Sequence, residues 1–337
     1  MAYRKKKKKL TKKQKKQQTR LTLFVAIILL SFSMGLFLGG NNQSRINLRD
    51  KINHIKEEWT AIFKDFSSKK NDENLVGSKS AYFRILDVGQ GSSTLLQSED
   101  GTTILIDSGR YEDKNKKILT YLDHYVGIGG KIDLLIFTHN DSDHIGYGDL
   151  ILQYYDVQEI WMNGYDSTSK VYERVLDAIE NSQARYVEPK SGESYQVGPF
   201  ELEVLNPTVE SRNNPNDDSI VTKISFADFS GLFSGDASTR VEKDIIEEKN
   251  SDLTADLLLM GHHGSETSTS EEWIKAVQPK ISVYSTGKNN GYDHPGKEAI
   301  DRLKKSSIPI YGTSKNGTVT VKANNDGTFI IETEKEE

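Results

Sequence analysis

Four side chains that often bind metal ions crowd into six consecutive residues of this sequence: His139, Asp141, Asp143 and His144. A mostly apolar run of strand length, residues 132–137, precedes them, and apolar residues at helical spacing follow. The motif is therefore predicted to lie where a buried strand ends and a helix begins. Carboxylates this close repel one another unless a cation lies between them. Imidazole and carboxylate together favour zinc, manganese or iron, and a polar loop without metal is the alternative.

Three further polar clusters also follow predicted strands or precede helices, where a rigid scaffold presents loop groups. Asp236 directly follows an apolar strand, so its carboxylate can point into a cleft and bridge two metal ions. His262 and His263 follow the apolar run 257–260 and lie between two glycines, which let the backbone approach closely. His294 lies in a polar loop. Together with the first motif, these clusters contain five of the seven histidines, although each cluster taken alone is also compatible with an ordinary surface loop.

Composition narrows the chemistry further. The chain has no cysteine, which excludes thiolate metal sites, disulfides and a cysteine nucleophile. Of the 44 basic residues, 11 lie in residues 1–20, which contain no acid, so the remainder carries 33 basic against 49 acidic residues. A body this acidic is not typical of a protein that binds nucleic acid tightly without sequence preference. A polyanionic substrate would have to be held mainly by metal ions.

The N-terminal segment predicts a membrane anchor. Residues 1–20 form a basic head, and residues 21–40 form an uncharged apolar span long enough to cross a bilayer as a helix. Basic residues next to such a span remain on the cytoplasmic side, so the rest of the chain is expected outside the cell. A cleaved signal peptide is the alternative, but residues 38–41 make a poor cleavage site. The expected location is the cell membrane, with a single span.

Residues 41–80 are predicted to be a helical linker. Apolar residues between 46 and 66 recur at the four-three spacing of a heptad stripe. Two interpretations remain open: a short coiled coil that joins two or more copies of the chain, or an amphipathic helix that packs on its own domain. The polar residues 67–80 lead into the globular body.

The globular body, residues 81–337, alternates strand and helix patterns. Predicted strands cover residues 81–88, 93–97, 102–106, 132–137, 158–162, 200–205, 220–226, 231–233, 257–260, 281–284, 308–311, 318–322 and 328–333. Predicted helices cover residues 114–125, 169–181, 238–249, 270–277 and 296–304, besides the helix that follows the metal motif. Strands in two groups with interspersed helices favour two sheets sandwiched between helices.

Several motifs, taken together and in order, match one family. They are Asp87-Val88-Gly89-Gln90-Gly91-Ser92-Ser93, Asp107-Ser108-Gly109, the His-x-Asp-x-Asp-His motif, Ser234-Gly235-Asp236, Gly261-His262-His263-Gly264-Ser265 and His294-Pro295. Over residues 81–333 the chain resembles the metallo-β-lactamase fold hydrolases. More narrowly, it is similar to the extracytoplasmic nuclease-like domain of the ComEC-type competence DNA-uptake proteins. The resemblance implies an α+β fold of four layers, helix–sheet–sheet–helix (αββα).

Two departures from the broad family pattern are visible. The family has His-x-His-x-Asp-His, whereas this chain has Asp141 at the second histidine, as the competence-type branch does. A histidine between the two halves, another common ligand, has no match, and residues 213–219 stand there with Asp217 and Asp218 as the available carboxylates. More oxygen ligands tilt the expected metal toward manganese, with zinc as the alternative.

The resemblance also implies a role for each site residue. Two divalent ions, zinc or manganese, would share a hydroxide that attacks phosphorus. The implied ligands are His139 and Asp141 for one ion, Asp143, His144 and His263 for the other, and Asp236 as the bridge. Asp143, His262 and His294 are the implied catalytic residues, with the two histidines acting on the leaving oxygen or a phosphate. Asp87 is expected to orient a ligand histidine.

The expected function is a membrane-anchored, extracytoplasmic metal-dependent hydrolase. Its expected substrate is a phosphodiester, and DNA is the foremost candidate, which would make the protein a nuclease. One alternative keeps the metals and changes the ester, for example to cell-wall phosphorylcholine or a lactone. Another is a non-catalytic binding module whose metal site has decayed and whose heptad stripe is the functional part.

Overall fold

The computed structural model describes residues 79–208, 211–248 and 252–335. The basic head (1–20), the expected anchor (21–40) and the heptad stripe (46–66) lie outside the described residues, and these remain predictions. The same holds for the linker up to residue 78. In the part of the chain that the structure describes, no helix is both long and apolar enough to cross a bilayer.

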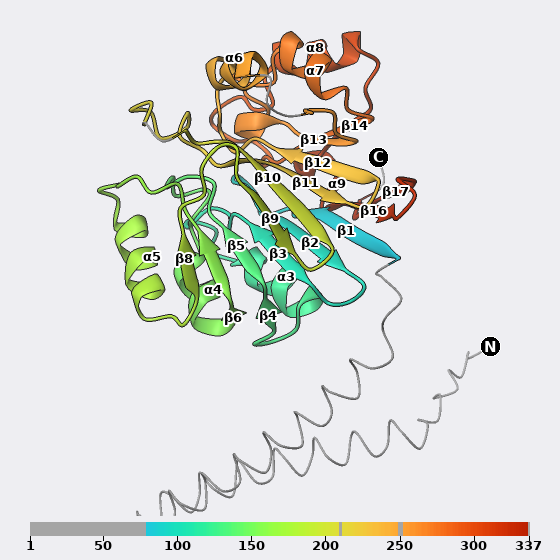
Figure 1. The fold of residues 1–337 in the computed structure, drawn as a ribbon. Coiled ribbons are helices and arrows are strands. Elements are labelled where there is room, and N and C mark those ends of the chain that lie inside the picture. The colour runs from blue at the N-terminus through green and yellow to red at the C-terminus, as the bar shows by residue number, and fades with distance from the viewer. Residues whose placement is uncertain (1–78, 209–210, 249–251, 336–337) are drawn as a thin grey trace, which may run out of the picture. The chain divides into compact units, whose positions relative to one another are not determined.

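Two β-sheets lie face to face and form the middle of the domain (Figure 1). The strands of the first sheet, in spatial order, are β17 (Phe329–Thr333), β16 (Val319–Asn324), β1 (Ser80–Ile85), β2 (Thr94–Ser98), β3 (Thr103–Ile106), β5 (Leu134–Ile136), β7 (Glu159–Trp161) and β8 (Arg185–Val187). Those of the second are β15 (Ile310–Gly312), β14 (Ile281–Tyr284), β13 (Leu257–Leu259), β12 (Phe229–Phe233), β11 (Val221–Phe226), β10 (Phe200–Asn206) and β9 (Ser194–Val197). A separate pair joins β4 (Lys131–Ile132) to β6 (Asp156–Val157).

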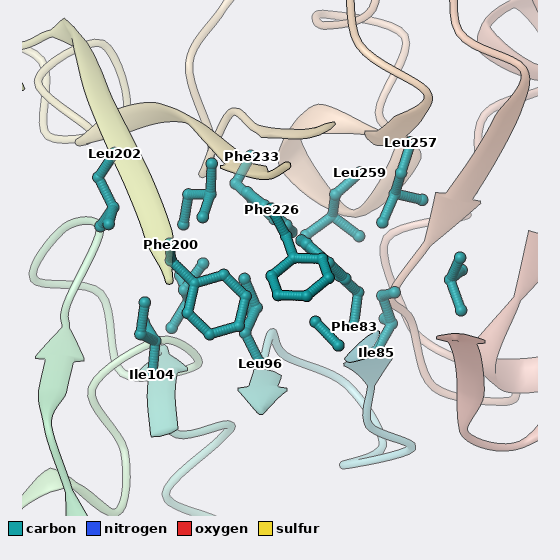
Figure 2. Packing of buried hydrophobic residues seen from close by; sticks show 14 of the residues in the cluster. Phe83, Ile85, Leu96, Ile104, Phe200, Leu202, Phe226, Phe233, Leu257 and Leu259 are labelled. Atoms are coloured by element: carbon teal, nitrogen blue, oxygen red, sulfur yellow. The ribbon is translucent and has the colours of Figure 1, made fainter. Parts of the chain in front are cut away.

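The main core lies between the two sheets and is rich in phenylalanine (Figure 2). Because side chains alternate along a strand, Phe83 and Ile85 of β1 point into this core while Arg84 points outward. The Phe83 ring meets the Phe229 ring edge-on, with centroids 5.0 Å apart, which is a favourable arrangement for aromatic pairs. Contacts of this kind fix one sheet against the other and so fix the loops at their edges.

Helices cover both outer faces. On the first sheet lie α3 (Lys117–Tyr125), α4 (Gly148–Tyr154) and α5 (Lys170–Glu180), which bury Leu122, Ile151 and Val175 against Leu105 and its neighbours. On the second sheet α6 (Thr239–Glu248), α7 (Glu271–Val277) and α8 (Lys297–Lys305) pack in the same way, and a short α9 (Thr313–Asn316) follows β15. The predicted αββα arrangement of two sheets between helices is therefore confirmed.

Local differences from the predicted elements have physical causes. The helix predicted from residue 114 begins at Lys117, because the Asp113 carboxylate accepts a hydrogen bond from the Lys117 backbone N–H (2.9 Å) and Lys116 is left-handed, with φ 49°. Strands β8 and β9 were not predicted. Both are short edge strands that pair with β7 and β10, and neither contains a fully buried residue. In β9, Tyr195 and Val197 alternate with polar residues and pack against the main core.

Parallel pairing brings the polar loops to one edge of the sandwich. Strand β3 runs parallel to β5 in the first sheet, and β12, β13 and β14 run parallel to one another in the second. Parallel neighbours end at the same edge of their sheet, so the loops that follow them are neighbours too. The segments after β3, β5, β12, β13 and β14 contain all the motifs that sequence analysis singled out for metal binding or catalysis.

Candidate metal centre

The metal motif begins where β5 ends, and Asp107 holds it there. Asp107 follows β3, is 1% exposed, and accepts a hydrogen bond from the Thr138 backbone N–H (2.8 Å). The Thr138 hydroxyl donates to the same carboxylate (2.9 Å to Oδ2). Asp107 has a φ of 60°, a conformation that side-chain-bearing residues adopt only where the surrounding structure imposes it. This carboxylate therefore holds in place the residue that directly precedes His139.

Asp107 also orients His144. Its Oδ2 lies 2.7 Å from His144 Nδ1, and both side chains are 1% exposed. A carboxylate oxygen can only accept, so His144 carries a proton on Nδ1 and its Nε2 faces the loops of the second sheet. A histidine fixed in this way presents the Nε2 lone pair of its neutral ring to a metal ion.

His263, in a loop of the second sheet, is oriented in the same way, by an acceptor at its Nδ1. It follows β13 in the short 3-10 turn η1 (Gly261–Gly264), where His262 and His263 both have positive φ, 50° and 56°. Its Nδ1 lies 3.0 Å from the carbonyl oxygen of Ser285, which follows β14. Because a carbonyl only accepts, the proton is again on Nδ1 and Nε2 is the free nitrogen.

The two oriented rings meet nitrogen to nitrogen. Nε2 of His144 lies 3.3 Å from Nε2 of His263, and in the neutral rings both atoms carry lone pairs. The Nε2 atom of His139 is also buried and has no hydrogen-bond partner. The ring of His139 lies 4.1 Å from that of His144, centroid to centroid. Three convergent imidazole nitrogens without donors repel one another unless a proton or a metal cation lies among them.

Three carboxylates surround these nitrogens. Asp236 is 4% exposed, and its oxygens lie 3.2 Å from His144 Nε2 and 3.8 Å from both His139 Nε2 and His263 Nε2. Asp143 lies 3.4 Å from His263 Nε2. Asp141 lies 3.7 Å from His139 Nε2, and its side chain is 51% exposed. Asp236 thus approaches all three nitrogens, whereas Asp143 and Asp141 each approach one of them. Five of the six expected ligands belong to compact groups of ligand atoms, and Asp141 lies outside these groups.

The ligand atoms form two overlapping groups. One atom from each of His139, His144 and Asp236 lies within 4.8 Å of the other two, and the same is true of Asp143, His144 and His263. The donor set of imidazole nitrogens and carboxylate oxygens suits zinc or manganese. Lone pairs that face each other and a buried nitrogen without a partner show that these residues fit divalent metal ions.

The charges of the cluster support this fit. Burial disfavours the charged form of His144, yet the carboxylates of Asp236 and Asp107 raise its pKa well above the usual value. Burial likewise opposes ionisation of Asp236, but the neighbouring charged histidines His144 and His263 hold its pKa well below the usual range. The pKa of Asp143 is also lowered, against burial, by its hydrogen bond to His263. The carboxylates are therefore ionised at neutral pH and attract a cation.

The two expected catalytic histidines flank the cluster. His262 Nε2 lies 3.5 Å from Asp236 Oδ2, and its Nδ1 lies 3.3 Å from the Thr267 hydroxyl. The His294 ring lies 5.5 Å from the His262 ring, centroid to centroid, and its Nδ1 is buried without a partner. Burial lowers the pKa of both rings, so they are neutral near pH 7. They are placed to contact a group bound at the centre.

One sequence-based assignment changes, and the carboxylates between the two halves are not ligands. Asp87 was expected to orient a ligand histidine, but its carboxylate pairs with Lys117 (3.4 Å) and Lys335 (2.9 Å). That role belongs to Asp107, which the sequence showed only as part of an Asp-Ser-Gly turn after a strand. Asp217 and Asp218, the carboxylates between the halves, bind backbone N–H groups of Ser238 (3.3 Å) and Arg212 (2.8 Å) and are outside the cluster.

The fold and the site together define the class of protein, a metal-dependent hydrolase built on two facing sheets. Residues 86–288, more than half of the chain, match the metallo-beta-lactamase superfamily, and the chain belongs to that superfamily. The expectation drawn from the motifs is confirmed at this level.

Within this superfamily, the chain is similar to several curated proteins. The chain is 30% identical to ComE operon protein 3 of Bacillus subtilis over 263 residues, which cover 73% of this chain and 34% of the relative. It is 26% identical to competence protein ComA of Neisseria gonorrhoeae over 72% of this chain and 32% of the relative. It is 28% identical to recombination protein 2 of Haemophilus influenzae, over 70% of this chain and 28% of the relative. The chain thus spans about a third of the length of the curated relatives it matches.

Among solved structures, the chain is similar to the metallo-beta-lactamase fold protein YhfI from Bacillus subtilis. The similarity has a TM-score of 0.48 at 14% identity and covers 73% of this chain and 100% of that one.

Proposed function

We propose that this chain is an extracytoplasmic, membrane-anchored phosphodiesterase that cleaves DNA with divalent metal ions. The observation that carries the proposal is the convergence of three imidazole nitrogens and three carboxylates at one edge of the sandwich. The names of two relatives, which refer to competence and to recombination, support a nucleic-acid substrate. The apolar span at residues 21–40, beside the basic head, supports the anchor.

The chain's own residues would divide the work as follows. His139, Asp141, Asp143, His144, Asp236 and His263 would hold the ions. When bound, divalent ions acidify water and neutralise charge that develops on phosphoryl oxygens. Asp107 and the Ser285 carbonyl keep His144 and His263 in the tautomer that can bind metal. His262 lies beside Asp236, and the His294 ring lies 5.5 Å from the His262 ring. Both can donate hydrogen bonds to a phosphate oxygen, which would hold the ester in place.

The phosphodiesterase proposal is tested on the purified full chain, stripped of metal and reloaded with manganese or zinc. End-labelled single- and double-stranded DNA and bis-p-nitrophenyl phosphate are the substrates. Cleavage should require metal and should fall below detection in His263→Ala, while Asp252→Asn, which changes an exposed carboxylate that belongs to none of the motifs, should retain it. DNA left intact under both metals would refute the nuclease proposal.

One observation favours a different ester. The body carries more acidic than basic residues, which repels a long polyanion such as DNA. The same assay therefore includes p-nitrophenyl phosphorylcholine and a lactone. If the metal-loaded chain hydrolyses one of these two esters and leaves DNA intact, the result would refute the nuclease proposal and support an esterase that uses the same site. Less than about one ion per chain at saturation would instead favour a non-catalytic binding module.

The anchor is tested separately, in cells that produce the chain. Membrane fractionation should place the chain in the membrane, and added protease should digest residues 81–337 in intact cells. Release of the chain in soluble form would refute the uncleaved anchor.

A further inference from the structure

A hollow of about 450 Å³ lies directly behind His294. The loop from Gly287 to His294 forms one wall and the α9 residues Ser314 and Lys315 form the other. Asn289, Asn290 and Asp293 complete the lining. His294 belongs both to this hollow and to the metal centre, so a molecule bound at the centre can extend past His294 into it.

The hollow carries net positive charge on an otherwise acidic body. Lys288 and Lys315 line it, both are exposed, and neither forms an ion pair with a described carboxylate. Asp293 is the one acid among the lining residues. Two lysines without carboxylate partners in a polar recess are the usual way in which a protein holds a phosphate group as a point charge.

The wall of the hollow is preorganised by Asn290. Its amide nitrogen donates to the carbonyl oxygens of Gly287 (3.1 Å) and His294 (2.6 Å). Its amide oxygen accepts from the backbone N–H groups of Tyr292 (3.2 Å) and His294 (3.0 Å). One side chain thus ties both ends of the loop together, so the recess and the His294 ring keep a fixed relation to each other.

An exposed aromatic ring lies at the end of the same loop. The side chain of Tyr292 is 56% exposed, and its ring lies 5.9 Å from the His294 ring at an interplanar angle of 27°. A ring held nearly parallel to a neighbour, with much of its surface open, is a platform on which a nucleobase can stack.

We propose that this loop and Lys315 form a subsite for the nucleotide next to the phosphate that reacts. Lys288 and Lys315 bind the neighbouring phosphate, and Tyr292 stacks on a base that is free of its complementary strand. The proposal rests on the proposed nuclease function and adds a preference: the substrate is a single strand with at least two phosphates, and a small diester uses the centre alone.

The test compares two substrates in each variant of the full, metal-loaded chain. A single-stranded oligodeoxynucleotide fills both the centre and the subsite, whereas bis-p-nitrophenyl phosphate reaches only the centre. In Lys288→Gln/Lys315→Gln, kcat/KM should fall about tenfold more for the oligonucleotide than for the small diester. The slope of log kcat/KM against log salt should also fall by about 1 for the oligonucleotide.

A matched control removes the same charge elsewhere. Lys275→Gln/Lys304→Gln changes two exposed lysines on α7 and α8 that do not line the hollow, and it should alter both substrates equally. For the base, Tyr292→Ala should lose about five- to tenfold on the oligonucleotide, whereas Tyr292→Phe keeps the ring and should stay within about twofold. Equal losses on both substrates in the Lys288→Gln/Lys315→Gln variant would overturn the subsite. A loss in the control that is selective for the oligonucleotide and as large as that of the Lys288→Gln/Lys315→Gln variant would overturn it too.

Binding separates this inference from the proposed function. Fluorescence anisotropy of a labelled oligonucleotide with the metal-free chain measures the subsite without cleavage. If the chain does not cleave DNA but binds the oligonucleotide more weakly after Lys288→Gln/Lys315→Gln, the subsite stands and the nuclease proposal fails. If the chain cleaves DNA and the variant cleaves and binds like wild type, the subsite fails and the nuclease proposal stands.

Discussion

Replacing Asp107 with asparagine should weaken metal binding without removing a ligand. The carboxylate accepts from the Thr138 backbone N–H through Oδ1 (2.8 Å) and from His144 Nδ1 through Oδ2 (2.7 Å). Asparagine has one acceptor oxygen and one donor nitrogen. The oxygen must face the fixed N–H of Thr138, so the amide nitrogen faces His144 Nδ1. His144 then has to accept at Nδ1 and carry its proton on Nε2, where a metal ion would bind.

The expected cost is about 10- to 100-fold in metal affinity, which is the usual effect of changing the partner of a ligand histidine. This corresponds to about 1.4–2.7 kcal/mol. Calorimetric titration of zinc into the metal-free full chain gives the affinity, and nitrogen-15 NMR of histidine-labelled, zinc-loaded protein reports which nitrogen of His144 holds the proton. The wild type should show Nδ1 protonated.

The matched control is Asp133→Asn. Like Asp107, Asp133 accepts a hydrogen bond from a backbone N–H, that of Thr103 (2.9 Å), but it is only partly buried. It precedes β5 and lies at the opposite end of the strand. The Asp133→Asn variant should bind zinc with the affinity of the wild type. The reasoning is refuted if Asp107→Asn folds and binds zinc within about twofold of wild type, or if wild-type His144 is protonated on Nε2 when zinc is bound.

Three further predictions concern the centre and the scaffold. Asp236→Asn should reduce the number of zinc ions bound per chain, measured by elemental analysis after dialysis, because one carboxylate contacts all the convergent nitrogens; unchanged stoichiometry would contradict this. Burial opposes ionisation of Asp87, but Lys335 and Lys117 outweigh it and lower its pKa below 3.8. The stabilisation by ionised Asp87 is therefore present above pH 3.8, and it is lost as the pH falls through the lower pKa that Asp87 has in the folded chain. In urea unfolding, Asp87→Asn should therefore destabilise the chain at pH 6 and much less at pH 2. Phe83→Ala should cost about 3–5 kcal/mol of unfolding free energy in the same assay, because the ring is fully buried between the sheets, and a loss below about 1 kcal/mol would contradict that packing.

Most strands and helices could be predicted from the sequence because their patterns depend on local periodicity. Ile104 and Ile106 of β3 alternate with Leu105, and the structure turns the first two toward the core between the sheets and the third toward the helices. Such patterns follow from side-chain geometry along a strand and need no knowledge of distant residues. The edge strands β8 and β9 carry less of that signal, because they have only three and four residues and none of these is fully buried.

The candidate ligands were identifiable from residue type and position. His139, Asp141, Asp143 and His144 are close in sequence, and Asp236 and His263 follow apolar strands. Parallel strands deliver their following loops to one edge, so position after a strand carries information about proximity. The sequence therefore determined the fold class, the family and the residue types at the centre.

Only the tertiary structure decided which atoms face one another. Asp107 and Asp87 are both carboxylates after strands, and nothing local distinguishes them, yet one orients His144 and the other pairs with two lysines. The Ser285 carbonyl that fixes His263 is a backbone group and leaves no mark in the sequence. A hydrogen bond across the sandwich depends on how two sheets pack and on the direction of single lone pairs, and those are properties of the assembled chain, not of any segment of it.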